Sequence, residues 1–197
     1  MNQNKCNVLW ISITLLSFCI ICGASATLAA PSKEQIEQQR ADIQKMADET
    51  LARLYKTQPG AEKAIKKAAG YAVFSNFGMK ILFAGGGSGK GIAVNNKAKK
   101  STFMKMIEVQ AGLGMGIKKF RLIWVFENKS DLDMFINSGW EIGGQATAAA
   151  QASGEGASLA GAMSIKPGVW LYQLTDDGLA LELTAKGTKY YKDDNLN

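Results

Sequence analysis

The chain has 197 residues, a formal net charge of +6 and no histidine. Its three cysteines all lie within the first 22 residues. Beyond that segment the composition therefore excludes zinc and copper sites built on histidine and cysteine. It equally excludes catalytic groups of the Ser–His–Asp and Cys–His types.

The start of the chain is typical of a secretory signal peptide. Lys5 precedes an uncharged apolar run at residues 8–21, and a short stretch of small residues then ends at Ala26. The run is shorter than the roughly 18 apolar residues that a membrane-spanning helix needs. We expect residues 1–26 to be removed, with cleavage after Ala29 as the alternative. The protein is therefore expected to be exported, either to the periplasm or out of the cell.

Cys6, Cys19 and Cys22 would leave with this leader, so the mature protein would contain no disulfide. Lipidation of Cys19 or Cys22 is the alternative, although Phe18 and Ile21 stand where a small residue is expected. Without the leader, 22 basic and 17 acidic residues remain, which gives a net charge of +5. Outside the cytoplasm this excess favours phospholipid headgroups or polysaccharide over nucleic acid.

An N-terminal helical segment is predicted for residues 27–69. Ser32 and Gln35 have the spacing of a capping box, and apolar residues recur every three or four positions in a helix predicted at 33–56. Pro59-Gly60 is expected to end that helix. A second, short helix is predicted at 61–69 and is expected to end at a glycine.

The remainder, residues 70–192, is predicted to be mostly β. An Asp-Gly turn at 176–178 between two alternating apolar runs is the strongest hairpin signal. The sequence predicts an α+β fold, with the N-terminal helices packed on a strongly curved antiparallel sheet or partial barrel that has Gly/Ala-rich strands. We expect strands at 71–75, 79–87, 90–95, 102–113 and 119–127, with a turn at 76–78 between the first two. A short helix is expected from Ser130 to about 137, and further strands at 139–148, 156–165, 169–175 and 179–185.

Glycine is concentrated between residues 85 and 91, inside apolar sequence that favours strands. A phosphate-binding P-loop requires glycine five positions before Gly89 and a hydroxyl residue after Lys90. Ala84 and Gly91 stand there instead, so we interpret the glycines as sites of close backbone approach or sheet curvature. The glycines with this expected structural role are Gly70, Gly78, Gly85, Gly86, Gly87, Gly89, Gly91, Gly112 and Gly114.

Several motifs in order resemble the SYLF domain, the Ysc84-type lipid-binding module. They are AAGYAVF at 68–74, FAGGGSGKGIAV at 83–94, QAGLGMG at 110–116 and LIWVFEN at 122–128, and the likeness extends over about residues 35–191. The resemblance implies a non-enzymatic domain without cofactor or metal that binds phospholipid. Phosphoinositides and actin are implicated for cytoplasmic relatives, so only general lipid binding is expected of an exported bacterial version.

The candidate lipid-binding residues are basic side chains and one tryptophan at a loop end. Each lysine or arginine near an anionic leaflet contributes on the order of 1 kcal/mol. The alternative for each lysine cluster is ordinary solvated surface. The candidates are Lys63, Lys66 and Lys67, then Lys97, Lys99 and Lys100, then Lys118, Lys119 and Arg121, together with Trp140.

Two other classes of function remain open from the sequence. The first is a self-associating envelope scaffold or protein-interaction domain, which would form homo-oligomers through its small-residue strands. An enzyme is disfavoured, because the paired carboxylates at Asp131/Asp133, Asp176/Asp177 and Asp193/Asp194 lie in predicted turns or caps.

Overall fold

The structure is a computed structural model that describes residues 31–81, 84–111, 116–142, 159–176, 178–180 and 187–197. Its elements belong to one unit spanning Ser32–Asn197. The predicted signal peptide lies outside the described residues, as do Gly112, Gly114 and the Ala/Gly/Ser-rich segment at 143–158.

Helix α1 (Lys33–Thr57) begins as the sequence predicts. The Ser32 Oγ accepts a hydrogen bond from the Gln35 N–H at 3.2 Å, and the Ser32 N–H donates to Gln35 Oε1 at 2.8 Å. This capping box supplies partners for backbone N–H groups that have none within the first turn of a helix. The buried side chains Ile43, Ala47, Leu51 and Leu54 follow helical spacing on the face that packs on the sheet.

Helix α2 (Pro59–Lys67) corrects the predicted boundaries. Pro59 starts this helix instead of separating the two, because the first helical position requires no N–H donor. The helix ends before Ala68, whose backbone is extended. Gly70 is therefore the first residue of a strand and not a helix C-terminal glycine. A Cβ at Gly70 would lie 2.6 Å from Leu132 Cδ2, so close packing accounts for this glycine.

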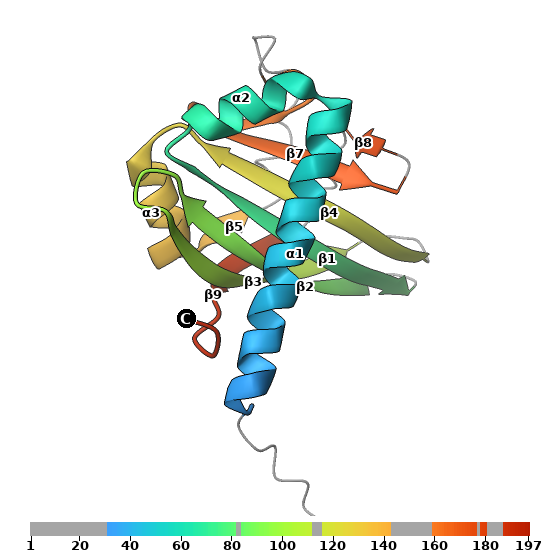
Figure 1. Cartoon of the computed structure of the whole chain (residues 1–197). Coiled ribbons are helices and arrows are strands. Elements are labelled where there is room, and N and C mark those ends of the chain that lie inside the picture. The colour runs from blue at the N-terminus through green and yellow to red at the C-terminus, as the bar shows by residue number, and fades with distance from the viewer. Residues whose placement is uncertain (1–30, 82–83, 112–115, 143–158, 177, 181–186) are drawn as a thin grey trace, which may run out of the picture. The chain divides into compact units, whose positions relative to one another are not determined.

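The strands form one curled antiparallel sheet, which confirms the predicted α+β fold (Figure 1). Their spatial order is β5-β9-β3-β2-β1-β4-β7-β6, and β8 pairs with β7. Helix α1 lies diagonally across one face of the sheet (Figure 1). The strands are β1 (Gly70–Ile81), β2 (Ala84–Asn95), β3 (Lys100–Ala111), β4 (Gly116–Phe126), β5 (Trp140–Ile142), β6 (Met163–Lys166), β7 (Val169–Thr175), β8 (Gly178–Ala180) and β9 (Gly187–Lys192).

Several predicted boundaries were wrong. Residues 159–162, within the strand predicted at 156–165, are not in a strand, and β6 begins at Met163. Strand β1 continues through residues 76–78, where a turn was expected, and β2 is one strand where two were expected. Helix α3 (Lys129–Asn137) has Asn128 and not Ser130 at its N-cap. The hairpin at 176–178 is confirmed, since Thr175 pairs with Gly178 across it. Strand β9 was not predicted.

Each face of the sheet has its own buried core. The face under α1 and α2 buries Val73, Ile92, Ile123 and Tyr172 together with apolar side chains of both helices. The opposite face carries an aromatic core that α3 covers. Its members include Phe74, Trp124, Phe126, Phe135 and Tyr190. Ring centroids there lie 4.9 to 6.3 Å apart, within the range of favourable edge-on and offset contacts.

The glycines of β2 make room for this aromatic core. A Cβ at Gly91 would lie 2.7 Å from Phe74 Cγ, and a Cβ at Gly89 would lie 2.7 Å from Met106 Cγ. Both distances are shorter than real Cβ atoms show. Each Cβ would come closer still to a carbonyl oxygen of β1, that of Val73 for Gly91 and that of Ser75 for Gly89, so both the β1 backbone and the large side chains require glycine here. Strand β2 continues through Lys90 to Asn95 between β1 and β3. This confirms that the glycines belong to a β framework and not to a P-loop.

Candidate functional site

The turn between β2 and β3 is fixed against the C-terminal end of α2. The Asn96 Nδ2 donates to the carbonyl oxygens of Ile65 at 2.7 Å and Ala68 at 3.0 Å. The backbone N–H of Asn96 donates to the Ala69 carbonyl at 3.0 Å. These three hydrogen bonds hold two segments together that are about 30 residues apart in the chain.

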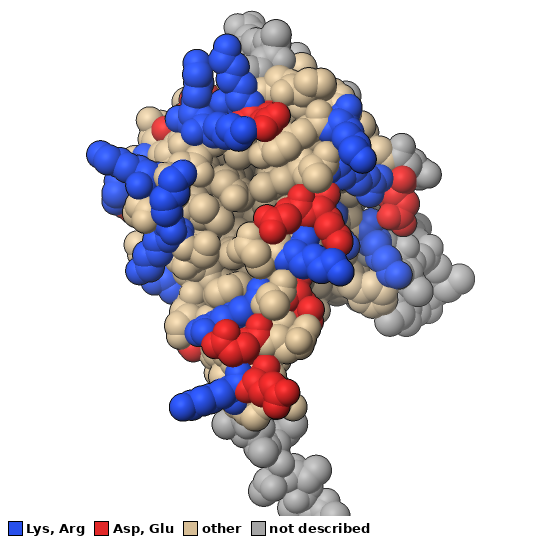
Figure 2. All heavy atoms as spheres, in the orientation of Figure 1, with Lys and Arg blue, Asp and Glu red and all other residues tan. Residues whose placement is uncertain are grey.

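This contact brings two of the three predicted basic clusters to one end of the fold. All six lysines are exposed. Figure 2 shows lysine and arginine side chains gathered over α2 and beside the β2–β3 turn. Within the described part of the chain, only Lys66 of these six has a carboxylate at ion-pair distance, Glu62 at 2.6 Å. We call this surface the basic end, and its residues are Lys63, Lys66, Lys67, Lys97, Lys99 and Lys100.

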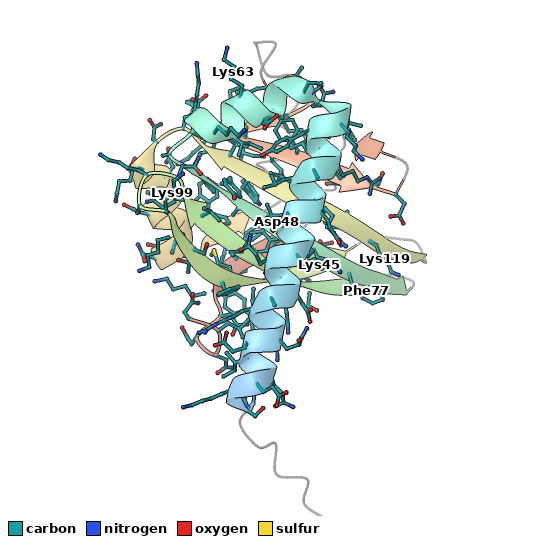
Figure 3. The ribbon with its side chains drawn as sticks, viewed as in Figure 1. Lys45, Asp48, Lys63, Phe77, Lys99 and Lys119 are labelled. Carbon is teal, nitrogen blue, oxygen red and sulfur yellow. The ribbon has the colours of Figure 1, made fainter. Side chains whose placement is uncertain are left out.

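The third predicted cluster lies elsewhere. Lys119 on β4 is the cross-strand partner of Phe77 on β1. Phe77 lies seven residues after Gly70, so it is about 23 Å from the start of β1. Figure 3 shows Lys63 and Lys99 towards one end of the molecule, and Phe77 and Lys119 towards the other. Arg121 is half-buried and donates to the Ser75 Oγ, and the side chain of Lys118 lies outside the described set.

Trp140 has a packing role that the sequence did not predict. It is half-buried, and its ring centroid lies 5.7 Å from that of Trp124 and 5.8 Å from that of Phe135. The Lys166 ammonium lies 5.0 Å from the centroid of the Trp140 ring. Trp140 therefore contributes to the margin of the aromatic core, and its contact with a membrane stays a prediction.

The chain is similar to a known protein family and to a named bacterial protein. Residues 107–197 match the family model Ysc84, described as "Las17-binding protein actin regulator". These residues are a Ysc84 domain. The chain is also 34% identical over 160 residues to "Beta cell expansion factor A" of Aeromonas veronii, a match that covers 81% of this chain. The chain spans 59% of the length of that relative.

The Ysc84 match extends from Ile107 in β3 to the end of the chain, whereas β1, β2 and both N-terminal helices precede it. Strand β1 nevertheless pairs with β4, and β2 pairs with β3, so one sheet joins the two parts. The family resemblance predicted from the sequence is confirmed. Neither of the two matching descriptions names a catalysed reaction.

The chemistry available near the Ysc84 domain is limited. Over the described ranges, no three His, Cys, Asp and Glu side chains are placed to share a metal ion. None of the described helices is both long and apolar enough to cross a bilayer. Burial raises the pKa of Tyr55 and of Tyr172 to about 12, and it is also the main cause of the raised pKa of Tyr71. Tyr55 belongs to α1, and Tyr71 and Tyr172 lie on the strands beneath it, all three against the same core. Their pKa shifts therefore reflect burial in that core.

The sequence did not predict an uncovered apolar area on the sheet. Phe77, Ile107 and Val109 are exposed, with 46%, 46% and 68% of their surfaces accessible. A signal was present in β3, where the segment FMKMIEV at 103–109 has apolar residues on both faces of the strand. One face buries Met104 and Met106, and the other leaves Ile107 and Val109 accessible.

Proposed function

We propose that this chain is a non-enzymatic module that binds anionic phospholipid through its basic end. The observation that supports this most directly is the contact of Asn96 with α2. It gathers six exposed lysines on one surface, where Glu62 is the only carboxylate paired with any of them in the described structure.

The charge of the basic end sets the expected strength of binding. At about 1 kcal/mol for each of five unpaired lysines, the attraction amounts to about 5 kcal/mol, equivalent to a dissociation constant of about 0.2 mM. Such binding is weak and is screened by salt, because the charges are exposed and interact across water. It suits reversible association with a membrane surface.

The cell envelope is part of the proposal. It rests on the signal peptide predicted at residues 1–26, which would place the domain outside the cytoplasm. The family description refers to Las17 and actin, and the name of the A. veronii relative refers to beta cells. The lipid assignment rests on the basic end and on the resemblance to lipid-binding SYLF domains.

The test is co-sedimentation of the protein with vesicles of increasing anionic lipid content at low and high salt. We expect binding to rise with the anionic fraction and to fall with salt. The double variant Lys97→Gln/Lys99→Gln removes two charges worth about 2 kcal/mol, so it should bind about thirtyfold more weakly.

The matched control is Lys33→Gln/Lys45→Gln, which removes the same charge from exposed positions of α1. Its binding should change much less, since these lysines lie outside the basic end. Equal binding to neutral and anionic vesicles would contradict the proposal. So would an equal loss in the two double variants.

A further inference from the structure

The sheet face under α1 continues past the helix as a surface that no described element covers. Phe77, Ser88 and Ile107 are direct cross-strand partners on β1, β2 and β3, so their side chains share one face. The same face carries Val73 and Ile92 beneath α1, because alternate residues of a strand point to the same side. We call Phe77, Ile107 and Val109 the apolar patch.

A groove of about 430 Å³ lies on this surface. Phe77 stands on one side, Ile107 and Tyr191 stand on the other, and Ser88 and Gly89 form the floor. The floor is low because β2 carries only small residues where its neighbours carry large ones. The volume falls within the roughly 300–1,000 Å³ that is typical of small-molecule sites.

Positive charge lies at one end of the groove. Lys90 and Lys105 line this end and are cross-strand partners. Arg121 lies in the same row across the sheet, because Ser75 pairs with both Arg121 and Lys90. Lys105 is paired with Asp193 at 2.8 Å. The Lys90 ammonium donates to the neutral Gln39 Oε1 at 2.9 Å. In the described structure no carboxylate lies at ion-pair distance from Lys90, so its charge is available to an anion.

The groove offers no backbone groups to an incoming peptide. Strand β2 pairs with β1 and β3, and β3 also pairs with β9 along Met104 to Val109. The N–H and C=O groups of these strands are therefore used within the sheet, whereas peptides that bind sheets pair with a free edge. An apolar chain needs no hydrogen-bond partner and fits a floor of this kind.

We propose that this groove binds a single fatty acid, with its carboxylate at Lys90 and its acyl chain between Phe77 and Ile107. On β2 the groove runs from Lys90 to Ser88, and the exposed Val109, opposite Gly86, continues the apolar surface beyond it. From Lys90 to Gly86 the strand extends about 13 Å, the length of roughly ten extended methylene groups. Lys90 thus matches the head of an amphiphile and the apolar patch matches its chain. Lys119 and Lys189 lie at the outer margins of the patch, as the cross-strand partners of Phe77 and Ile107. The site is separate from the basic end and requires no membrane.

The test measures displacement of a fluorescent fatty acid from the protein by unlabelled competitors below their micelle-forming concentrations. A fully buried methylene group improves affinity about fourfold, so an open groove that covers half of the chain gives about twofold. Dodecanoate should therefore compete at roughly sixteenfold lower concentration than octanoate. Competition that is independent of chain length would overturn the proposal.

Substitutions in the groove test the acyl-chain contacts and the carboxylate contact separately. Phe77→Asn and Ile107→Asn should each weaken dodecanoate binding, and both alter exposed positions that the fold tolerates. Met134→Asn, at an equally exposed apolar residue of α3, is the control and should bind normally. Lys90→Gln should weaken dodecanoate and leave the uncharged dodecan-1-ol unaffected. An equal loss of both ligands would contradict the assignment of Lys90.

Two further measurements identify other occupants. Phe77→Asn should co-sediment with anionic vesicles as the wild type does, while Lys97→Gln/Lys99→Gln should keep its fatty-acid affinity. If Phe77→Asn instead abolishes vesicle binding and no fatty acid binds, the patch inserts into bilayers. If light scattering shows a dimer that Ile107→Asn dissociates, a second copy covers it. Either result overturns the fatty-acid proposal. The first would also show that the basic end alone does not hold the protein on a membrane, whereas Lys97→Gln/Lys99→Gln tests the basic end by itself.

Discussion

Single glycines on β2 determine which large side chains the aromatic core can hold. Gly91 pairs with Phe74 on β1 and with Met104 on β3, so the side chains of these two residues flank the position that a Cβ would occupy. Gly86 lies on the opposite face of the same strand, where a Cβ would be 3.5 Å from the Glu108 carbonyl oxygen. That is an ordinary contact distance. Two glycines five residues apart therefore have different roles.

This difference predicts the effect of alanine at each position. Gly91→Ala forces Phe74 or the strand to move, and we expect a loss of about 1–3 kcal/mol in the free energy of unfolding. Gly86→Ala should change it by less than about 0.5 kcal/mol, because among the described atoms the added methyl group meets only the Glu108 carbonyl oxygen, at an ordinary contact distance. Urea denaturation of both variants checks this. Equal losses would show that Gly91 does not serve to admit Phe74.

The sequence indicated the role of these glycines but not their partners. Their density inside apolar sequence predicted close approach, and that holds for Gly89 and Gly91. Their partners depend on strand register, which the expected turn at residues 76–78 would have shifted. The turn prediction failed because β1 continues through Asn76 with its side chain buried and donating to Glu108 Oε2 at 2.6 Å. That contact joins β1 to β3, and local sequence does not specify it.

At the scale of elements, the features that local chemistry specifies were predictable. The capping box of α1 and the β7–β8 hairpin each depend on a few neighbouring residues. Strand β9 depends on pairing with β3 and β5, and its sequence GTKYYK has little apolar character of its own. The basic end likewise combines features that local sequence specifies with a contact between distant segments. Its lysine clusters were visible in the sequence, whereas the contact that joins them was not.

Asn96 is the residue that joins these elements, and its removal gives a prediction. Asn96→Ala loses two side-chain hydrogen bonds to carbonyls at and just beyond the C-terminal end of α2, so we expect about 1–2 kcal/mol less stability. Vesicle binding should also weaken, because the turn lysines are no longer held beside those of α2. The measurements are urea denaturation and co-sedimentation with anionic vesicles.

The control for Asn96→Ala is a variant at a remote position that loses a similar amount of stability. Ser32→Ala removes the capping box of α1, which is worth about 1 kcal/mol. Ser32→Ala should bind vesicles as the wild type does. If it binds as weakly as Asn96→Ala, general destabilisation and not the geometry of the basic end explains the loss.

Considered as a whole molecule, the fold separates two kinds of surface along the length of its strands. The basic end gathers at the start of β1, and the apolar patch lies near the other end of β1, β2 and β3. One flat membrane surface touching the basic end would leave the groove accessible. The two proposals can therefore be tested independently on the same protein.

Buried tyrosines in both cores predict how the whole molecule responds to alkali. Burial raises the pKa of Tyr172 to about 12 and raises that of Tyr190 as well, against about 10 in the unfolded chain. Below pH of about 10 both states keep these protons, so the full stability is present. Above it the unfolded state loses protons that the folded state retains, and stability falls as pH rises towards about 12.

Urea denaturation near neutral pH and again at a pH of about 11 measures this loss. Tyr172→Phe removes one of the ionising groups while keeping its ring in the core, so its stability should fall less steeply between the two pH values. Comparing the two slopes cancels the contribution of the lysines, which titrate in the same range in both proteins. Identical slopes would mean that Tyr172 ionises as readily in the folded protein as in the unfolded chain, and its burial would then be incomplete in solution.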